Sequence, residues 1–193
     1  MKIGVLALQG DFAEHASILR RLGVDSREVR LAGDLDGLDG LIIPGGESTT
    51  ITRLIQSYDL WEPLRTFATE KPVWGTCAGM IVMAHHATDL DRPTLDLMDI
   101  EVQRNAFGSQ VDSFETDVEM DEVPGGPVHA VFIRAPIILN VGEGVKRLAV
   151  LEDGTIVAAR QGRLLVTSFH PELTNDLRIH SYFLSLAGSR EDD

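Results

Sequence analysis

Short apolar runs alternate with amphipathic segments along the first half of the chain. Residues 3–8 form an apolar run that predicts a buried strand, and residues 11–22 then carry apolar side chains at helical spacing up to Gly23. Strands that alternate with helices pair in parallel, so we expect a parallel sheet with helices on both faces. The same pattern continues with predicted strands over 27–31, 40–44 and 73–76, and predicted helices over 49–57, 60–68 and 78–85.

The second half is dominated by strand-like segments. The expected fold is therefore α/β: a mixed, mostly parallel central sheet flanked by helices, with antiparallel strands added in the C-terminal half. After Leu95, short segments with Gly and Pro between them predict strands over 98–103, 113–119, 130–134, 147–151, 155–161 and 163–169, followed by a last helix over 176–186.

The chain is predicted to form a single domain. Its 193 residues are close to the ~150 of one ordinary domain. The sequence contains no internal repeat, low-complexity segment or Pro/Ser-rich linker. We expect the domain to cover residues 1–187 and to be followed by a polar tail over 188–193, which frays.

Charge and cysteine content narrow the possible partners and the compartment. The chain carries 17 Lys and Arg against 30 Asp and Glu, a net charge of −13, so repulsion opposes binding to nucleic acid or to an anionic membrane. A single cysteine excludes an intrachain disulfide and a multi-thiolate metal site, and it fits a reducing compartment. The N-terminus lacks a signal-peptide pattern, and no apolar run approaches the ~18 residues of a membrane helix. We expect a cytoplasmic protein.

The lone cysteine lies in the most informative segment of the sequence. Residues 73–80 predict a strand, then Gly75-Thr76-Cys77-Ala78-Gly79, then a helix, which is the form of a nucleophile elbow with Cys in place of Ser. Glycines two residues before and after the cysteine remove side chains that would clash in this strained turn. The helix N-terminus favours the thiolate. A buried apolar Cys is the common alternative, but the glycines and their context favour Cys77 as a nucleophile.

A thiol nucleophile needs a base, and His170 has the most persuasive setting of the six histidines. It follows a predicted strand, so it should lie at the carboxyl edge of the sheet, where open α/β sheets bind ligands. Pro171 should keep the backbone extended, so that Glu172 points to the same side as His170 and accepts from one imidazole nitrogen while the other faces Cys77. A surface His beside a Pro turn is the alternative. We predict a triad of Cys77, His170 and Glu172.

A glycine-rich loop, Pro44 to Thr50, follows a predicted buried strand and leads into a helix. It is not a phosphate loop, because the required Lys is absent and Glu47 would repel phosphate. Gly46 can adopt a positive φ and aim an N–H into the site, where it would form a two-donor oxyanion hole with the N–H of Ala78. A simple turn with Ser48 as the helix N-cap is the alternative, and both can hold together.

Other polar clusters are weaker candidates. The pair His85-His86 is expected to end a helix, where adjacent residues point apart, so we expect no metal there and no cofactor elsewhere. Arg104 and Arg134 are either surface residues or a carboxylate clamp, and spacing alone does not decide between these. The acidic residues between His86 and Arg104 lack the pattern of a calcium loop and are expected on the solvated surface: Asp89, Asp91, Asp96 and Asp99.

Several blocks of residues together carry a family resemblance over nearly the whole chain. They are Gly4 to Gly10, Pro44 to Thr50, Gly75 to Gly79, Arg104 to Gly108, Gln110 to Glu115, Phe132 to Pro136 and Ser168 to Thr174. The chain resembles the class I, triad-type glutamine amidotransferases, whose fold is flavodoxin-like. The Gly-Gly-Glu-Ser-Thr-Thr, Arg-Asn-Ala-Phe-Gly and Phe-Ile-Arg-Ala-Pro blocks narrow the resemblance to the glutaminase subunits of pyridoxal 5'-phosphate synthase.

The resemblance implies hydrolysis of L-glutamine to L-glutamate and ammonia. It implies that Cys77 attacks the side-chain amide, and that His170 protonates the departing ammonia and then activates water against the γ-glutamyl thioester. Arg charges and backbone groups would hold the α-carboxylate of glutamine, with a carboxylate near its α-ammonium, and these charge types suit a free amino acid. The residues implied to hold the substrate are Gly46, Glu47, Ser48, Arg104, Ile133 and Arg134.

The resemblance also implies a partner protein. In the family, ammonia passes to a separate (β/α)8 synthase subunit of a hetero-oligomer, which combines it with a pentose phosphate and a triose phosphate into pyridoxal phosphate. The glutaminase is nearly idle until docking orients its glycine-rich loop into an oxyanion hole. Gln9 is implied as a contact with the partner. Ser109 departs from the family pattern, which usually has Arg there, but it leaves every proposed catalytic position intact.

Three other functions stay open at this point. A glutaminase subunit of another amidotransferase, such as the one in histidine biosynthesis, would share the chemistry and differ only in its partner. A catalytically silent binding module would be favoured by loss of a triad residue, and all three are present. A cysteine peptidase or esterase would use the same elbow, but Arg104, Arg134 and Glu47 suit a free amino acid better.

Overall fold

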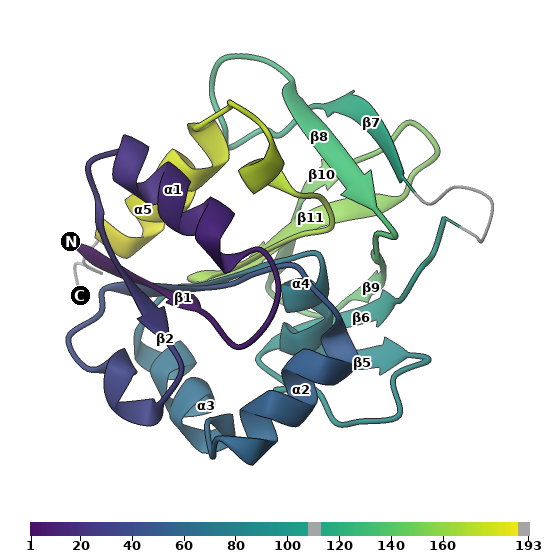
Figure 1. Cartoon of the computed structure of the whole chain (residues 1–193). Coiled ribbons are helices and arrows are strands. Elements are labelled where there is room, and N and C mark those ends of the chain that lie inside the picture. Colours follow the sequence, from purple (N-terminus) through teal and green to yellow (C-terminus); the bar gives the residue numbers. More distant parts are fainter. Residues whose placement is uncertain (108–112, 189–193) are drawn as a thin grey trace.

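The computed structural model describes residues 1–107 and 113–188, so Ser109 and the tail beyond residue 188 lie outside the described residues. A central sheet has helices on both sides (Figure 1). The strands are β1 (Lys2–Leu6), β2 (Asp25–Val29), β3 (Gly40–Ile43), β4 (Val73–Thr76), β5 (Ala84–Thr88), β6 (Met98–Gln103), β7 (Ser113–Val118), β8 (Val128–Ile133), β9 (Ile137–Val141), β10 (Val145–Val150), β11 (Ile156–Gln161) and β12 (Leu164–Thr167). The α-helices are α1 (Phe12–Arg21), α2 (Ser48–Ser57), α3 (Trp61–Glu70), α4 (Ala78–Met83) and α5 (Arg178–Gly188), and the 3-10 turns are η1 (Ala32–Leu35) and η2 (Pro171–Leu173).

Strands from both halves of the chain join into one ten-stranded sheet. The order is β2-β1-β3-β4-β12-β11-β9-β6-β5, and β10 pairs with β11. Neighbours from β2 to β12 are parallel, whereas β11 is antiparallel to β12, β9 and β10, and β9 is antiparallel to β6. The parallel half has the strand order of a flavodoxin-like sheet. The predicted mixed, mostly parallel α/β fold with added antiparallel strands is confirmed.

The sheet separates two hydrophobic cores. In Figure 1, α1 and α5 lie on one face of the sheet and α2, α3 and α4 on the other. Ile43 of β3 packs in the core that contains Ile51 of α2, whereas Trp74 of β4 packs with Leu19 of α1 and Phe183 of α5. Because both faces are covered, all four residues of β3 are buried. None of the helices in the described residues is long and apolar enough to cross a membrane.

The hairpin of β7 and β8 is a separate two-stranded sheet that packs into the second core. Phe114 stacks on Phe132 with ring centroids 4.5 Å apart, and Phe132 meets Phe169 in an edge contact at 5.5 Å. The N–H of His170 donates to the carbonyl of Val131 at 2.9 Å. The hairpin therefore fixes the segment that leaves β12, which is where the predicted base lies.

The predicted helix over 78–85 is wrong at its C-terminal end. Helix α4 stops at Met83, and Ala84–Thr88 form strand β5. Strand β5 pairs with β6 around an irregular register, and His85 and His86 are both exposed on it. No Gly or Pro marks the boundary in the sequence. The helix ends because pairing with β6, a distant segment, overrides the local preference.

Strand β9 is the other departure from the predicted elements. Its residues, Ile137–Val141, lack the alternating burial of a half-buried strand. It becomes a strand because it fills the place between β11 and β6, antiparallel to both. The remaining predicted helices and strands are present, with bounds that differ by no more than two residues at either end.

The carboxyl ends of four adjacent parallel strands meet at one edge of the sheet. These strands are β1, β3, β4 and β12. The segments that leave them carry Gln9, the glycine-rich loop, Cys77 and His170, in that order. Open α/β sheets bind their ligands at this edge, so the topology brings together the candidate residues that lie far apart in the sequence.

Away from this edge, Glu122 links several elements. Its carboxylate accepts hydrogen bonds from Lys146 Nζ at 2.6 Å, from Arg160 Nε at 3.2 Å, and from the hydroxyl of Tyr182. Burial raises the pKa of Glu122, but these bonds outweigh it and lower the pKa to about 2. The cluster ties the segment before β8 to β10, β11 and α5.

The Glu122→Gln variant is expected to lose ~1–2 kcal/mol of unfolding free energy at neutral pH, because it removes the charge that binds two cations. The pKa of Glu122 is depressed in the folded state, so this difference is complete above pH 4.5 and disappears as the pH falls through about 2. Urea unfolding of both proteins across this range measures it. The exposed Glu152 provides the control, Glu152→Gln. A difference that persists undiminished in acid would contradict the assignment.

Candidate active site

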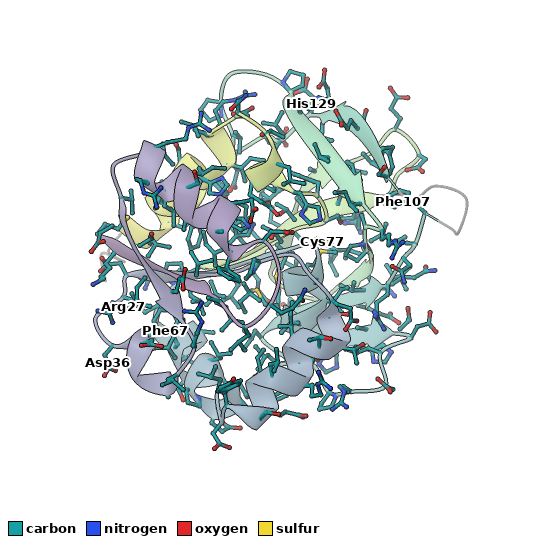
Figure 2. The ribbon with its side chains drawn as sticks, viewed as in Figure 1. Arg27, Asp36, Phe67, Cys77, Phe107 and His129 are labelled. Carbon is teal, nitrogen blue, oxygen red and sulfur yellow. The ribbon has the colours of Figure 1, made fainter. Side chains whose placement is uncertain are left out.

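Cys77 lies between the last residue of β4 and the first residue of α4. Its φ of 47° and ψ of −104° form a conformation that costs a non-glycine residue ~1–3 kcal/mol. The N–H of Cys77 donates to the carbonyl of Thr167 in β12 at 2.8 Å, which holds the turn in place. Its side chain is only 7% exposed and lies near the centre of the view in Figure 2. The strained strand-to-helix turn predicted from the sequence is confirmed.

Two glycines make this turn possible. A Cβ on Gly75 would lie 2.6 Å from the carbonyl carbon and oxygen of Gly79. A Cβ on Gly79 would lie 2.0 Å from the carbonyl oxygen of Ile43. Both obstacles are backbone atoms, so no side-chain rotation relieves them. The geometry confirms that the glycines on either side of Cys77 are there to avoid clashes.

The Gly79→Ala variant is expected to unfold with a free energy at least ~2 kcal/mol below that of the wild type, because the new methyl group displaces the backbone of β3. Thermal or urea unfolding measures the loss. The matched control is Gly33→Ala, since a Cβ at Gly33 meets nothing within 4 Å, and this control should stay within ~0.5 kcal/mol of the wild type. Equal stability of the two variants would contradict the close approach of α4 to β3.

His170 lies just beyond β12 and faces two of the predicted partners. Its Nδ1 lies 2.7 Å from Oε1 of Glu172, and the nearby Cys77 thiol raises the pKa of the ring. His170 and Glu172 are 4% and 6% exposed. The structure thus brings thiol, imidazole and carboxylate together in that order. A proton on Nδ1 that is donated to Glu172 leaves Nε2 as the nitrogen that exchanges a proton with sulfur.

Glu172 reaches the imidazole by a route that differs from the predicted one. The expectation of an extended His-Pro-Glu segment is wrong, because Pro171–Leu173 form the 3-10 turn η2 with Pro171 in its first position. Proline suits that position, since its fixed φ is helical and its missing N–H is not needed there. The turn brings Glu172 back against His170, so the predicted contact between the two side chains is present.

The charges of this pair depend on each other. Burial lowers the pKa of His170, but hydrogen bonds with Cys77 and Glu172 outweigh it and raise the pKa to about 10. Burial raises the pKa of Glu172, and the hydrogen bond with His170 opposes that shift. A protonated imidazole is therefore stabilised between its two neighbours, which suits it to donate a proton to a leaving group.

The glycine-rich loop after β3 packs against His170 and against the end of β1. A Cβ on Gly45 would lie 2.5 Å from Cε1 of His170, so this close approach to the ring requires glycine. Gly46 has a φ of 156°, and a Cβ there would lie 2.5 Å from Oε1 of Gln9. The same oxygen accepts from the N–H of Glu47 at 2.8 Å. The predicted positive φ at Gly46 is confirmed, and Gln9 holds the loop that contains it.

Glu47, and not Ser48, caps helix α2. Its carboxylate accepts from the N–H groups of Thr49 and Thr50 at 3.0 and 2.7 Å. Burial raises the pKa of Glu47, but the bonds from these threonines outweigh it and hold the pKa below its usual value. Ser48 is the first residue of α2 and is 3% exposed. The alternative in which Ser48 caps the helix is wrong, because a carboxylate one residue earlier satisfies two donors and suits the positive end of the helix dipole.

The other residues predicted to bind substrate approach from two further segments. Arg104, which follows β6, has its Nη2 3.4 Å from Oε1 of Glu47, and its Nη1 donates to a backbone carbonyl after β5 at 2.6 Å. At the end of β8, the carbonyl of Ile133 lies 3.8 Å from Sγ of Cys77. Arg134, the next residue, has a φ of 44°. The predicted cation and anion, Arg104 and Glu47, are therefore paired with each other.

A second carboxylate, Asp11, lies beside the imidazole. Its Oδ2 is 3.5 Å from Nδ1 of His170, and ligand atoms of Asp11, His170 and Glu172 all lie within 4.8 Å of one another. This spacing could hold a cation, but Nδ1 of His170 is already engaged by Glu172 at 2.7 Å. Burial raises the pKa of Asp11, and the charge of His170 opposes the rise. The hydrogen bond to Glu172 and the charge of His170 beside Asp11 therefore account for the cluster.

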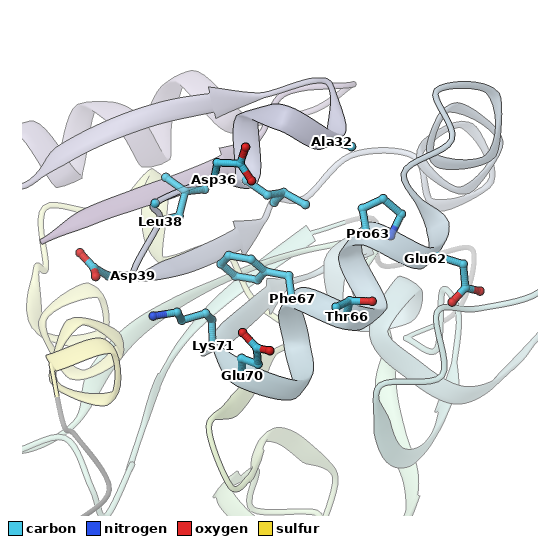
Figure 3. A pocket seen from close by; sticks show the side chains of 12 residues that line it. Ala32, Asp36, Leu38, Asp39, Glu62, Pro63, Thr66, Phe67, Glu70 and Lys71 are labelled. Atoms are coloured by element: carbon cyan, nitrogen blue, oxygen red, sulfur yellow. The ribbon is translucent and has the colours of Figure 1, made fainter.

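A separate hollow of about 620 Å³ lies away from these residues (Figure 3). One side of α3 and the segment before β3 line it, with Phe67 and Leu38 among its apolar residues and Asp36 and Glu62 among its acidic ones. The segments before β3 and β4 lie at the amino edge of the sheet. Because Cys77, His170 and Glu172 all lie at the carboxyl edge, this hollow is not the candidate site.

Two residues near the predicted triad have no motif that marks them in the sequence. Asp11 is expected there only as the start of a helix, and His15 is only one of the histidines. His15 is fully buried, and its Nε2 lies 3.4 Å from Oε2 of Glu172. Its position on the same helical face as Phe12 and Leu19 is the signal that predicts its burial.

Comparisons with known proteins show the family to which the chain belongs. A family model described as the SNO glutamine amidotransferase family matches residues 5–187. The protein named pyridoxal 5'-phosphate synthase subunit PdxT from Chloroflexus aurantiacus is 55% identical over 190 residues, which cover 96% of this chain and 100% of the relative. The protein of the same name from Herpetosiphon aurantiacus is 56% identical over 190 residues, with the same coverage of 96% and 100%.

Solved structures are similar as well. A crystal structure of a glutamine amidotransferase superimposes with a TM-score of 0.91 at 49% identity, covering 97% of this chain and 99% of the other. The structure of PurLQS from Thermotoga maritima has a TM-score of 0.71 at 13% identity, covering 95% and 97% of the two chains. At 13% identity, the similarity to PurLQS shows a shared fold only.

Proposed function

The chain belongs to the SNO glutamine amidotransferase family, and on that premise we propose that it is the glutaminase subunit of a pyridoxal 5'-phosphate synthase. It hydrolyses L-glutamine to L-glutamate and ammonia, and a synthase subunit consumes the ammonia. Relatives named as a subunit of that synthase, 55% and 56% identical over their whole length, support the choice of pathway.

The observation that carries the chemistry is the meeting of three side chains at the carboxyl edge of the sheet. Cys77 lies on a strained turn with a φ of 47°, next to an imidazole whose other nitrogen is 2.7 Å from the carboxylate of Glu172. A thiol beside a base that a third group orients is the arrangement of covalent acyl transfer. The buried setting of His170 keeps bulk water from competing with the thiol.

In the first half of the reaction, the proton of the Cys77 thiol has moved to His170, and Sγ attacks the side-chain carbonyl carbon of glutamine. The carbonyl oxygen becomes an oxyanion, for which we assign the N–H groups of Gly46 and Ala78 as donors. Ala78 is the first residue of α4, so its N–H has no acceptor within the helix. Collapse of the intermediate breaks the carbon–nitrogen bond as His170 protonates the departing ammonia.

In the second half, water hydrolyses the γ-glutamyl thioester. His170, now neutral, removes a proton from water, and the hydroxide oxygen attacks the thioester carbon. Breaking of the carbon–sulfur bond then releases glutamate and returns the proton to the thiol of Cys77. Glu172 holds the imidazole in one orientation and stabilises its protonated form throughout.

The polar side chains around the thiol suit the backbone of a free amino acid. Glu47 faces the α-ammonium of glutamine, and Arg104 and Arg134 face its α-carboxylate, with Gly46, Ser48 and Ile133 completing the pocket. The ion pair of Arg104 and Glu47, at 3.4 Å, holds both charges near each other in the absence of substrate. Binding exchanges that contact for two charge-assisted contacts with the zwitterion.

The partner is assigned by family membership. We propose a hetero-oligomer with a (β/α)8 synthase subunit, docked on the carboxyl edge where Gln9 lies. Gln9 accepts from the N–H of Glu47 at 2.8 Å, so a partner that moves Gln9 also moves the adjacent Gly46 and its N–H. The reaction is placed in the cytoplasm, where a free thiol stays reduced.

The experiment that tests the proposal measures glutamate release from L-glutamine with and without a purified pyridoxal 5'-phosphate synthase subunit. Stimulation by that subunit supports both the chemistry and the pathway. Glutaminase activity that is indifferent to this subunit would retain the triad and assign the chain to another amidotransferase. Absence of activity in both conditions would overturn the proposal in favour of a silent module.

A further inference from the structure

Two buried histidines, one from each of two outer helices, extend the row of contacting side chains beyond Glu172 of the triad. His15 of α1 and His180 of α5 are both 0% exposed. Nδ1 of His15 lies 3.0 Å from Nε2 of His180. Nε2 of His15 lies 3.2 Å from the hydroxyl oxygen of Thr76 and 3.4 Å from Oε2 of Glu172. His15 therefore contacts both the residue before the nucleophile and the carboxylate of the triad.

The hydrogen-bond partners define which ring nitrogens carry protons. Among the described residues, Nδ1 of His180 has no hydrogen-bond partner, and a bare nitrogen there costs less than a buried N–H without an acceptor. The proton of His180 therefore belongs on Nε2, where it is donated to Nδ1 of His15. His15 must then carry its own proton on Nε2, which points toward Thr76 and Glu172.

The acceptor that faces this N–H is Oε2 of Glu172. Oε1 of Glu172 is bound by His170 at 2.7 Å, whereas Oε2 is buried and has no hydrogen bond within the described residues. An ionised carboxylate oxygen in such a setting is costly unless a donor faces it. His15 Nε2, at 3.4 Å, is the N–H that faces it, and a shift of a few tenths of an ångström closes this contact to a hydrogen bond.

We propose that His15 is a positioning residue of the triad: its Nε2–H, oriented by His180, holds the carboxylate of Glu172 ionised and aimed at His170. This inference rests on the proposed glutaminase function. His15 touches neither substrate nor thiol, so it acts through Glu172. Its contact with Thr76 lets one imidazole align the turn that carries Cys77 with the carboxylate that orients the base.

The charged and titratable groups around this contact are consistent with a neutral His15. Burial, together with the nearby His180 and His170, keeps the pKa of His15 well below its ordinary value. Burial lowers the pKa of His180 to about 3. His170, which lowers the pKa of Glu172, and Asp11, whose negative charge raises it, are the other ionisable groups beside this carboxylate. Removing the Nε2–H donor should therefore raise the pKa of Glu172 further.

The first test compares His15→Leu with His15→Gln in the complex with the synthase subunit. Leucine fills the space without a donor, whereas the amide nitrogen of glutamine can take the place of Nε2. His15→Leu is expected to lower kcat by ~10-fold to 100-fold, to leave KM for glutamine nearly unchanged, and to move the acid limb of the pH profile to higher pH. His15→Gln should recover most of the rate and the wild-type acid limb.

The shift of the acid limb separates positioning from a purely structural role. Loss of packing alone would lower thermal stability and affect both variants, but would not move the limb in one and restore it in the other. A folded His15→Leu variant with wild-type kcat and wild-type pH profile would overturn the proposal. So would a His15→Gln variant that behaves like His15→Leu.

A second test does not depend on activity. Nitrogen-15 NMR of the histidine rings in the wild-type chain reports which ring nitrogen is protonated, and loss of one set of signals in His15→Gln or His180→Gln assigns them. The proposal expects neutral rings protonated on Nε2 at both positions at neutral pH. A proton on Nδ1 of His15 would overturn it. Inactivity of the wild-type complex would instead refute the proposed function. The NMR measurement would still decide whether His15 carries its proton on Nε2.

Discussion

Replacing Cys77 with alanine is expected to lower the partner-stimulated rate of glutamate release by ~10³-fold or more. The variant lacks the atom that forms the thioester, and the chain has no other cysteine that could substitute. The fold should be retained, since the thiol is a small part of the turn and the backbone bond from Cys77 to Thr167 remains. Stopped assays of glutamate formation, with saturating synthase subunit, measure the loss.

Two controls make this result specific. Thermal unfolding should give the alanine variant a stability close to that of the wild type, and binding of the synthase subunit should be unchanged. Cys77→Ser keeps the shape of the side chain and should be nearly as inactive, because a hydroxyl is a far weaker nucleophile at neutral pH. Retention of most of the stimulated rate in Cys77→Ala would refute the assignment of the nucleophile.

The second largest effect is expected for Glu172→Gln, with a fall in kcat of ~10²-fold. Glutamine matches the shape of glutamate, but it is neutral and can present an N–H to the imidazole, which favours the wrong tautomer of His170. Because the carboxylate contributes to raising the pKa of His170 to about 10, its loss should also lower the pH at which His170 gives up its proton. The pH dependence of kcat measures this shift.

Asp11 supplies a matched control for this variant. Its carboxylate also faces Nδ1 of His170, but at 3.5 Å, against 2.7 Å for Glu172. Asp11→Asn should therefore change kcat by less than ~5-fold, since only a short hydrogen bond orients the ring strongly. Equal losses in the two variants would mean that charge near the imidazole matters and that the specific contact with Glu172 does not.

Local patterns in the sequence predict the fold class and the nucleophile. Apolar runs alternating with amphipathic segments require parallel strands covered on both faces, and the structure confirms this sheet. Gly75 and Gly79 on either side of Cys77 predict a tight strand-to-helix turn, since a side chain at either position would meet backbone atoms within 2.6 Å. These predictions succeed because they depend on periodicity and on the spacing of glycines within one short segment.

Predictions of where elements end, and of the backbone and caps at those ends, are less accurate. The helix predicted to reach residue 85 ends at Met83, because pairing with β6 converts the next residues into β5. Glu47 replaces Ser48 as the cap of α2, since the carboxylate binds two backbone donors at once. The segment Pro171–Leu173 curls into a 3-10 turn, so the predicted contact of Glu172 with His170 is right although the predicted backbone is wrong.

The sequence by itself determined the family resemblance, the α/β architecture and the likeness of the Cys77 segment to a nucleophile elbow, because each is written in adjacent residues. Only the tertiary structure decided that Arg104 pairs with Glu47. It also decided that Gln9 holds the glycine-rich loop, and that His15 lies next to the carboxylate of Glu172. These contacts join segments that lie far apart in the chain. They arise where parallel strands end at one edge of a sheet, and no local spacing records which side chains meet there.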